Sequence, residues 1–123
     1  MKRKLKISAG KVELEAWLND TNTATKVFEA LPITSTVNTW GDEIYFTIPV
    51  DAKPEDAKEL VSLGDIGYWP PGKAMCIFFG KTPISRGDEI RPASPVNIIG
   101  KVEGDYRSLK KVKDGEKITI RPA

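Results

Sequence analysis

Polar and apolar residues alternate most regularly near the start of the chain, from Lys4 to Glu15, on both sides of Ala9-Gly10. Because a period of two places alternate side chains on opposite faces of a strand, the segment is typical of two paired strands. A two-residue turn at Ala9-Gly10 sets apolar residues opposite one another on one face and lysines opposite glutamates on the other: Ile7 with Val12, Leu5 with Leu14, Lys6 with Glu13 and Lys4 with Glu15. Matched pairs on both faces predict a β-hairpin in this register.

The pattern then changes to a helical period. Four apolar residues recur at the spacing of one helix face: Ala24, Val27, Phe28 and Leu31. Thr21 or Asn22 would cap the start, and Pro32 would end the helix. We therefore expect a short helix that packs one face against a sheet.

Two strands are predicted next, Ile33–Trp40 and Glu43–Val50, joined by a turn at Gly41-Asp42. The first is rich in β-branched residues, which favour strands. In the second, alternation puts Ile44, Phe46 and Ile48 on the core face and Glu43, Tyr45 and Thr47 on the other. Beyond them, Lys53–Leu60 begins with a Pro-Glu-Asp sequence that favours a first helical turn, and we expect one or two turns of helix there.

The middle of the chain combines loops with one unusually apolar strand. Gly64–Gly72 reads as a long aromatic loop, and Gly80–Ser94 as a long polar one. Between them, Lys73–Phe79 is apolar on both faces, so this strand must be covered on both sides.

The last third predicts a strand at Pro95–Glu103, a short helix at Asp105–Val112 and, after a turn at Asp114-Gly115, a strand at Lys117–Arg121. The whole pattern gives seven or eight short strands and two or three short helices. Strands that follow one another closely favour antiparallel pairing, so the fold class is mainly β. Eight strands in a chain of this size can close into a barrel filled by their own side chains, with helices at its ends.

Composition limits the possible chemistry. The chain has 123 residues, close to the size of one domain, and we expect a single domain over residues 1–123. A net charge of +2 is too small to predict binding to nucleic acid or to a membrane surface. Histidine and glutamine are absent and cysteine occurs once. The sequence thus excludes a Ser-His or Cys-His nucleophile, an internal disulfide and an ordinary zinc site, and we expect no metal and no cofactor.

The location of the protein in the cell is predicted from its N-terminal residues, its apolar runs and its single cysteine. Met1–Lys4 is basic but no apolar region follows, so we expect no signal peptide. No apolar run approaches the length of a membrane span. One free cysteine suits a reducing compartment, and the cytoplasm is the expected location. Many charges and nine prolines would suit a thermophile.

Seven segments, taken in order, resemble one known family. They are Gly10–Glu15, Thr23–Leu31, Trp40–Phe46, Gly67–Gly72, Cys76–Gly80 (CIFFG), Ile98–Val102 (IIGKV) and Lys117–Ile120 (KITI). Their order and spacing resemble the cyclophilins, and specifically the small prokaryotic cyclophilin-like proteins. The resemblance implies a closed eight-stranded antiparallel barrel with two short helices capping its ends. It also implies a groove that, in cyclophilins, binds proline-containing peptides and accelerates their cis–trans isomerisation.

The residues that perform that reaction in cyclophilins are poorly matched. Lowering a barrier of about 20 kcal/mol requires a hydrogen-bond donor to the twisted amide and an apolar pocket for the ring. The family arginine has no counterpart, because no arginine occurs between Arg3 and Arg86. Tyr45 falls near the family glutamine, and Arg91 and Val96 fall near the family tryptophan and histidine. Only the pocket phenylalanine is matched, by Phe79 or Phe78.

The candidate ligand-binding residues lie on three segments: Trp40, Glu43 and Tyr45, then Tyr68 and Trp69, then Phe78, Phe79 and Arg91. Glu43 beside Tyr45 would bind a cation or a polar ligand, or would simply lie on an exposed strand face. Tyr68 and Trp69 with two prolines would form a binding rim, or would fold onto the end of the barrel. Cys76 reads as a small buried residue. Arg86 or Arg91 would have to swing in from the long loop to replace the missing arginine.

Two hypotheses of function follow, beside a structural or assembly role in which an exposed aromatic loop would form a dimer contact. In the first, the barrel binds a small molecule or a peptide in a surface groove, without efficient prolyl isomerase activity. In the second, it is a weak or atypical peptidyl-prolyl isomerase, or an enzyme of another kind built around Glu43. We expect a monomer or a weak dimer, and no nucleic-acid or membrane partner.

Overall fold

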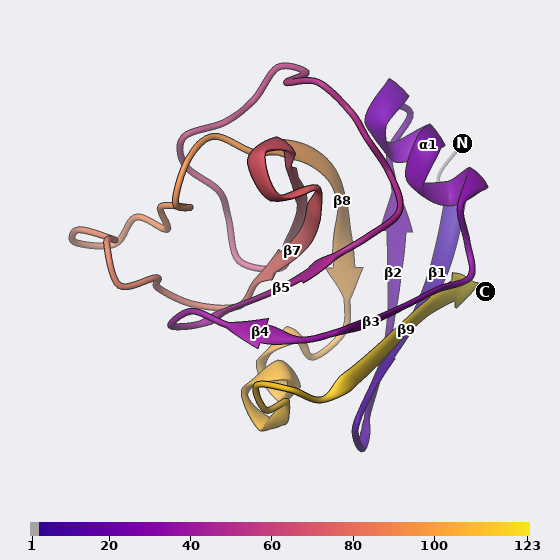
Figure 1. Cartoon of the computed structure of the whole chain (residues 1–123). Coiled ribbons are helices and arrows are strands. Elements are labelled where there is room, and N and C mark those ends of the chain that lie inside the picture. The colour runs from indigo at the N-terminus through magenta and orange to yellow at the C-terminus, as the bar shows by residue number, and fades with distance from the viewer. Residues whose placement is uncertain (1–2) are drawn as a thin grey trace.

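The computed structural model describes residues 3–123 and is built on one antiparallel sheet (Figure 1). Met1 and Lys2, part of the basic segment noted above, lie outside the described residues. Nine strands follow one another in this sheet in the order β3-β9-β1-β2-β8-β6-β7-β5-β4. Their bounds are β1 Arg3–Ala9, β2 Val12–Leu18, β3 Ile33–Thr36, β4 Asn38–Thr39, β5 Glu43–Thr47, β6 Asp65–Trp69, β7 Ala74–Phe78, β8 Asn97–Glu103 and β9 Lys117–Pro122.

The sheet curls into a nearly closed barrel because its two edge strands are almost one strand. Only Val37 separates β3 from β4, and these two lie at opposite ends of the strand order. The Ser35 hydroxyl on β3 donates a hydrogen bond to the Thr47 carbonyl on β5, 2.6 Å away. The predicted mainly β barrel is confirmed, and the ninth strand arises where the predicted strand Ile33–Trp40 is interrupted at Val37.

The predicted first hairpin forms, but its register was wrong. The turn is Gly10-Lys11 rather than Ala9-Gly10, and Gly10 has a φ of +56°, which a residue without a Cβ adopts most easily. Moving the turn by one residue moves the pairing by two, so Ile7 lies opposite Leu14 and Lys6 opposite Glu15. A shift of two preserves the faces, so the same apolar residues still point into the barrel.

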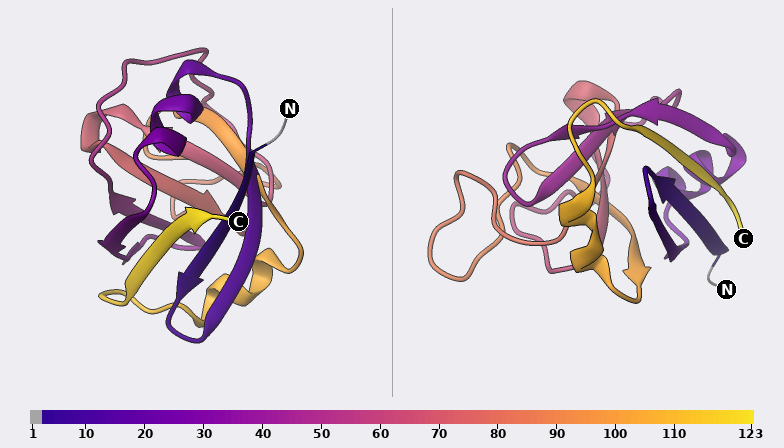
Figure 2. Two further views of the ribbon diagram at one scale, coloured as in Figure 1. Left: turned by 90° about the vertical axis from the view of Figure 1, so that its right-hand side faces the viewer. Right: turned by 90° about the horizontal axis from the view of Figure 1, so that it is seen from below.

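The helices close the two ends of the barrel. Helix α1, Asn22–Glu29, begins at the predicted cap Thr21, whose side chain accepts a hydrogen bond from the Ala24 amide. The predicted second helix is the 3-10 helix η2, Tyr106–Lys111, capped by Asp105. In Figures 1 and 2 α1 lies at one end of the barrel and the coil of η2 lies at the other.

Two predictions for the middle of the chain were wrong. Lys53–Leu60 is not helical, because the backbone of this region forms hydrogen bonds with a distant segment of the chain. Lys58 exchanges hydrogen bonds with Val96, and the Val61 amide donates to the Ile90 carbonyl. Gly64–Gly72 is not a loop, because Ile66 and Tyr68 alternate into the core as strand β6, which pairs with both β7 and β8. A short 3-10 turn, η1 Pro70–Gly72, completes the segment.

Strand β7 is covered on both faces, as predicted. Met75 and Ile77 point into the barrel core, whereas Cys76 and Phe78 point outward and form a second hydrophobic cluster with Ile90 and Val96. The cover on the outside comes from the 57–61 and 80–96 segments, and the latter projects from one side of the barrel in Figures 1 and 2. The barrel therefore carries a second, smaller core on its outer surface.

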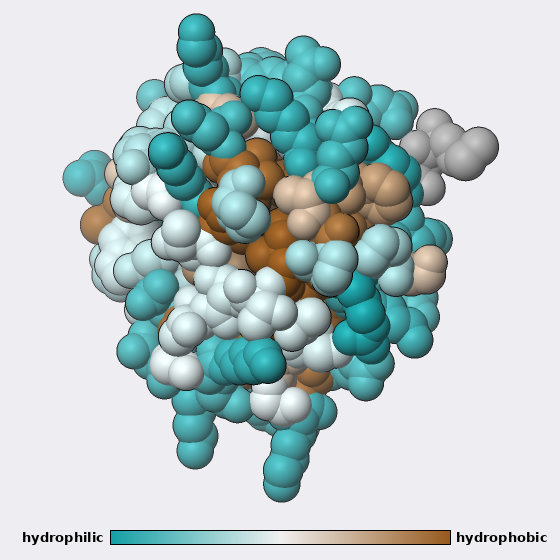
Figure 3. All heavy atoms as spheres, turned by 45° about the vertical axis from the view of Figure 1, so that its right-hand side comes forward, coloured by the Kyte–Doolittle hydropathy of each residue, from teal (hydrophilic) through white to brown (hydrophobic). Residues whose placement is uncertain are grey.

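Most of the surface shown in Figure 3 is hydrophilic, with hydrophobic residues visible between polar ones near its centre. The large hydrophobic residues that are exposed in the described structure are Leu60, Leu63 and Ile84. No helix within residues 3–123 is both long and apolar enough to cross a membrane.

Gly100 tests the close pairing of β2 with β8. A Cβ at this position would lie 2.1 Å from the Trp17 carbonyl oxygen, and backbone cannot move aside as a flexible side chain can. We expect Gly100→Ala to lower the free energy of unfolding by at least about 2 kcal/mol in urea denaturation. The control is the neighbouring buried residue: Ile99→Val should cost about 1 kcal/mol. Equal, small losses for both variants would contradict the close approach.

Candidate functional site

A hollow on the outer surface of the barrel gathers three of the six aromatic candidate residues. Its volume is about 290 Å³, and it is lined by Trp40, Glu43, Tyr45, Trp69, Pro92, Ala93 and Val96. We call it the Trp40–Trp69 pocket. It lies beside the second hydrophobic cluster, with which it shares Tyr45, Trp69 and Val96.

Strand alternation and two small residues create this hollow. Ile44 and Phe46 point into the core, so Glu43 and Tyr45 point outward from β5. Across the sheet, Tyr45 lies opposite Cys76, and Cys76 lies opposite Gly67. Since Gly67 has no side chain and Cys76 a short one, the sheet surface is low between the larger Tyr45 and Trp69. A Cβ at Gly67 would lie only 3.0 Å from Val96, so the loop residue sits directly against the strand.

Hydrogen bonds fix the Trp69 ring and the Trp40 backbone at the rim of the pocket. The Trp69 indole N–H donates to the Ser94 hydroxyl, 2.6 Å away. The Trp40 amide donates to the Glu43 carbonyl across the turn from β4 to β5 at 2.9 Å. Because its indole N–H is already bonded, the Trp69 ring loses little conformational entropy when it contacts a ligand.

The 80–96 loop forms the opposite wall. The Ser85 hydroxyl accepts hydrogen bonds from the Thr82 and Arg91 amides, both at 3.0 Å, and the Thr82 hydroxyl donates to the Arg91 carbonyl. These bonds close the loop on itself, and the pairing of Val96 with Lys58 fixes its end. Pro92, Ala93 and Val96 are thereby placed in the pocket.

Glu43 is the one acidic side chain in the pocket lining. Only 6% of the residue is exposed, and its Oε1 atom is buried without a hydrogen-bond partner. Because burial disfavours the charged carboxylate, the pKa of Glu43 is raised to about 8. The carboxyl group therefore holds its proton at neutral pH in the free protein and can change its charge when its surroundings change.

The structure brings together four of the eight candidate residues, namely Trp40, Glu43, Tyr45 and Trp69. The other four lie elsewhere. Tyr68 points into the barrel core, where its hydroxyl donates to the Val50 carbonyl at 2.6 Å and accepts from the Ala52 amide. Phe79 also lies in the barrel core, and Phe78 is buried in the second cluster.

Arg91 directly precedes the pocket residue Pro92 but its guanidinium does not line the pocket. Its Nε donates to the Glu89 carboxylate at 2.8 Å and a second nitrogen donates at 3.4 Å. This bond lowers the pKa of the Glu89 carboxyl and raises that of Arg91, so both groups keep their charges.

The candidate residues predicted from the sequence did not include Pro92, Ala93 and Val96, although the family resemblance had placed Val96 near an active-site histidine. A single loop gives no period from which its position over the sheet can be derived. Cys76, expected to be a small buried residue, is buried. Burial, and secondarily the Glu43 charge, raises the pKa of its thiol, which stays neutral. Among residues 3–123, no group of three or more acidic or thiol side chains is placed to hold a metal ion.

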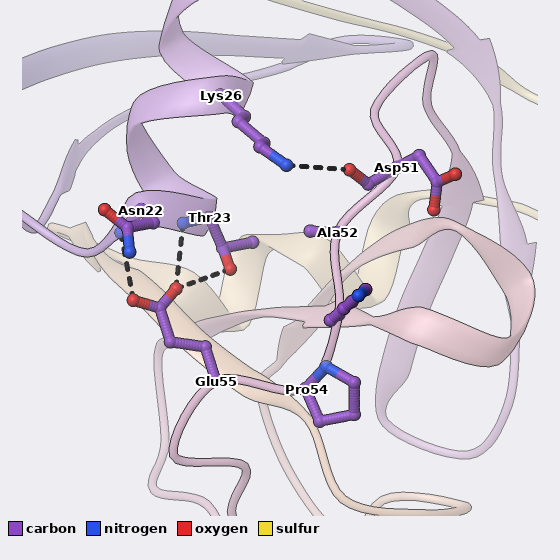
Figure 4. A pocket seen from close by; sticks show the side chains of 8 residues that line it. Asn22, Thr23, Lys26, Asp51, Ala52, Pro54 and Glu55 are labelled. Atoms are coloured by element: carbon purple, nitrogen blue, oxygen red, sulfur yellow. Dashed lines mark hydrogen bonds between the residues drawn. The ribbon is translucent and has the colours of Figure 1, made fainter.

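A second hollow, of about 460 Å³, lies between α1 and the 51–55 segment (Figure 4). Here the side chains of Glu55, Thr23 and Lys26 already have partners. Figure 4 shows the Glu55 carboxylate at the start of α1, where it accepts hydrogen bonds from the Asn22 and Thr23 amides, at 3.1 and 2.9 Å, and from the Thr23 hydroxyl at 2.7 Å. Lys26 donates to the Asp51 carbonyl. These contacts fasten the loop to the helix, which gives this hollow a structural explanation.

Comparisons with known proteins agree with the fold. A family model described as cyclophilin-like matches residues 3–121. The solution structure of the hypothetical protein AF2241 from Archaeoglobus fulgidus is 47% identical in sequence, with a TM-score of 0.83 over 99% of this chain and 95% of that one. The structure of McbB in complex with tryptophan is 13% identical, with a TM-score of 0.70; 96% of this chain is covered but only 44% of McbB. No curated protein matches the chain.

Replacing Glu43 should change how stability depends on pH. Because the folded state keeps the Glu43 proton up to a pKa of about 8, whereas the unfolded chain loses it near the usual glutamate value, ionisation disfavours the folded state as the pH rises between the two. Glu43→Gln should therefore gain stability relative to the unchanged chain from pH 5 to 8, by up to about 1.4 kcal/mol per pH unit. Urea denaturation across that range measures the difference, with Glu15→Gln on β2 as control. Parallel curves for Glu43→Gln and the unchanged chain would show that this carboxyl is not desolvated.

Replacing Glu55 should have the opposite pH dependence. Hydrogen bonds from the Thr23 side chain and backbone lower its pKa, so its stabilising charge is present at neutral pH and is lost as the pH falls through the folded-state pKa. We expect Glu55→Gln to cost about 1 kcal/mol at pH 7, through lost contacts with the helix N-terminus, and little once both states are protonated. The exposed Glu59, mutated to Gln, is the control in the same loop. A loss that stays constant down to acidic pH would contradict a charge-dependent cap.

Proposed function

We propose that this chain, which belongs to the cyclophilin-like family, binds a small organic molecule or a peptide in the Trp40–Trp69 pocket and lacks efficient prolyl isomerase activity. One observation carries the proposal. A hollow of about 290 Å³ has stiff apolar walls and one polar group whose hydrogen-bonding capacity is unused. Ligand sites in proteins typically combine apolar walls with a few polar groups that fix orientation.

Three features support binding rather than isomerisation. The pocket lining contains no arginine or lysine to stabilise a twisted amide. Arg91, which falls near the family's active-site tryptophan and is the nearest arginine to the pocket in sequence, donates a hydrogen bond to the Glu89 carboxylate. The two phenylalanines that resembled the family's proline pocket are both buried, one in each hydrophobic cluster.

The surface has room for either proposed ligand, a small molecule or a peptide. A groove of about 610 Å³ adjoins the pocket, since Ser94 lines the groove and accepts the hydrogen bond of the Trp69 indole. Its walls include Pro54, Pro70, Pro71 and Pro95. A peptide would occupy both hollows, whereas a small molecule would occupy the pocket alone. We favour a small molecule as the ligand, since the pocket alone has a volume of about 290 Å³. We place the protein in the cytoplasm, as a monomer or weak dimer.

The test of binding uses 2-phenylethanol as a neutral apolar probe and follows tryptophan fluorescence. A probe of this size should bind with a Kd of about 1 mM if it fills an apolar pocket. Trp69→Leu should weaken binding at least fivefold, because it removes a wall of the pocket. Trp17→Leu on β2, outside the pocket, is the matched control. No saturable binding to the unchanged chain, or equal binding to the Trp69 variant, would refute the assignment of this pocket.

The test of isomerisation is a coupled assay with several X-Pro peptides. We expect rates at the uncatalysed background. Clear turnover that disappears in Arg91→Ala would overturn the proposal, because it would show that this arginine leaves Glu89 and acts on the imide bond.

A further inference from the structure

We propose that the natural ligand of the Trp40–Trp69 pocket carries an organic ammonium cation, which lies against the three aromatic rings and beside the Glu43 carboxylate. This inference rests on the proposed function, and it adds the chemical class of the ligand. Two independent features carry it: the identity of the rings and the unpartnered state of the carboxyl group.

The rings are the first feature. Trp40, Tyr45 and Trp69 line a single hollow, and they reach it from three different strands or turns of the barrel. The faces of tryptophan and tyrosine are negative, so several rings around one hollow attract a positive charge, most strongly one that has lost its water. Alkylated ammonium groups are weakly hydrated and large enough to contact several rings at once. Pro92, Ala93 and Val96 add apolar contact for the alkyl part of such a ligand.

The carboxyl group is the second feature. Only 6% of Glu43 is exposed, and its Oε1 atom has no hydrogen-bond partner among the described residues. A buried acid is costly unless something compensates it, and here no lysine or arginine of the chain lines the pocket. A ligand cation would supply that compensation.

The surroundings leave the carboxyl free to respond to a ligand. The titratable groups next to Glu43 are Asp42, its neighbour in the chain, Tyr45, which lines the same pocket, and Cys76 on β7, whose thiol is affected by the Glu43 charge; Arg91 lies on the loop that forms the opposite wall. Cys76 is neutral, and Arg91 is already paired with Glu89. Binding of a cation would therefore be coupled to release of the Glu43 proton, and affinity would rise with pH until the carboxyl is fully ionised.

The experiment compares choline with 3,3-dimethyl-1-butanol, which has the same shape and no charge. Binding is measured by tryptophan fluorescence and by calorimetry at pH 8.5. We expect choline to bind at least tenfold more tightly than the alcohol. Its Kd should rise about tenfold for each pH unit below the pKa of Glu43, whereas the Kd of the alcohol should not change. Equal affinities for the two compounds would overturn the inference.

Two pairs of variants separate the contributions. Glu43→Gln should lower the preference for choline over the alcohol, measured as the ratio of the two Kd values, at least tenfold. The matched control is Glu13→Gln, which changes an exposed glutamate on β2 and should keep this ratio. Trp69→Phe should keep most of the preference and Trp69→Leu should lose it, because only the first retains a ring. Circular dichroism confirms folding of each. An unchanged preference in both Glu43→Gln and Trp69→Leu would refute the site.

The outcomes also separate this inference from the proposed function. Binding of 2-phenylethanol without a preference for choline would refute the ammonium ligand and leave the pocket as a binding site. Binding of neither compound would refute both. A further arm compares free choline with a short peptide that contains trimethyl-lysine: tighter binding of the peptide would identify a modified protein side chain as the source of the cation, and tighter binding of choline a small molecule.

Discussion

Burial of β7 on both of its faces is the constraint on which the site depends. The inner face is covered by the barrel core, but the outer face, with Cys76 and Phe78, has no helix to cover it. Loops must do so, and the 80–96 segment reaches across to place Ile90 and Val96 on this surface. Since a loop cannot match a sheet as closely as another sheet would, the cover is incomplete beside Tyr45 and Trp69. The Trp40–Trp69 pocket is the part of the outer face that remains open.

Alternation along a strand was the sequence signal that located most of the site. It placed Ile44 and Phe46 inside, so that Glu43 and Tyr45 had to point outward, and the double apolar character of 73–79 predicted the outer cover. The same reasoning failed for Gly64–Gly72, where glycine and proline at both ends concealed the alternation of Ile66 and Tyr68 into the core. Tyr68 was consequently predicted to bind the ligand, although its hydroxyl forms hydrogen bonds with the backbone of the 50–52 segment.

The errors that remained have a common physical origin. In the first hairpin, the apolar faces match in two registers, and the predicted register has two Lys–Glu pairs where the observed one has only Lys6 opposite Glu15. The observed register places Gly10 in the turn with a positive φ, which glycine adopts most easily. In Lys53–Leu60, the local preference for a helix loses to contacts with distant residues, since Lys58 pairs with Val96 and Glu55 caps α1. The local sequence pattern predicts the structure correctly where one face of an element must be buried. It fails where the backbone hydrogen bonds of a segment are supplied by residues far away in the sequence.

Glu43 and Glu55 show why a buried acid without partners points to a ligand. Glu55 accepts three hydrogen bonds from the start of α1, and its pKa falls, so the charge contributes to holding the fold together. Glu43 has a pKa of about 8 because burial is not offset by any such bond. Glutamine or leucine at that position would keep the strand without this cost. The Glu43 Oε1 atom has no hydrogen-bond partner among the described residues and lies in a pocket lined by three aromatic rings, and this arrangement supports the proposal of a cationic ligand.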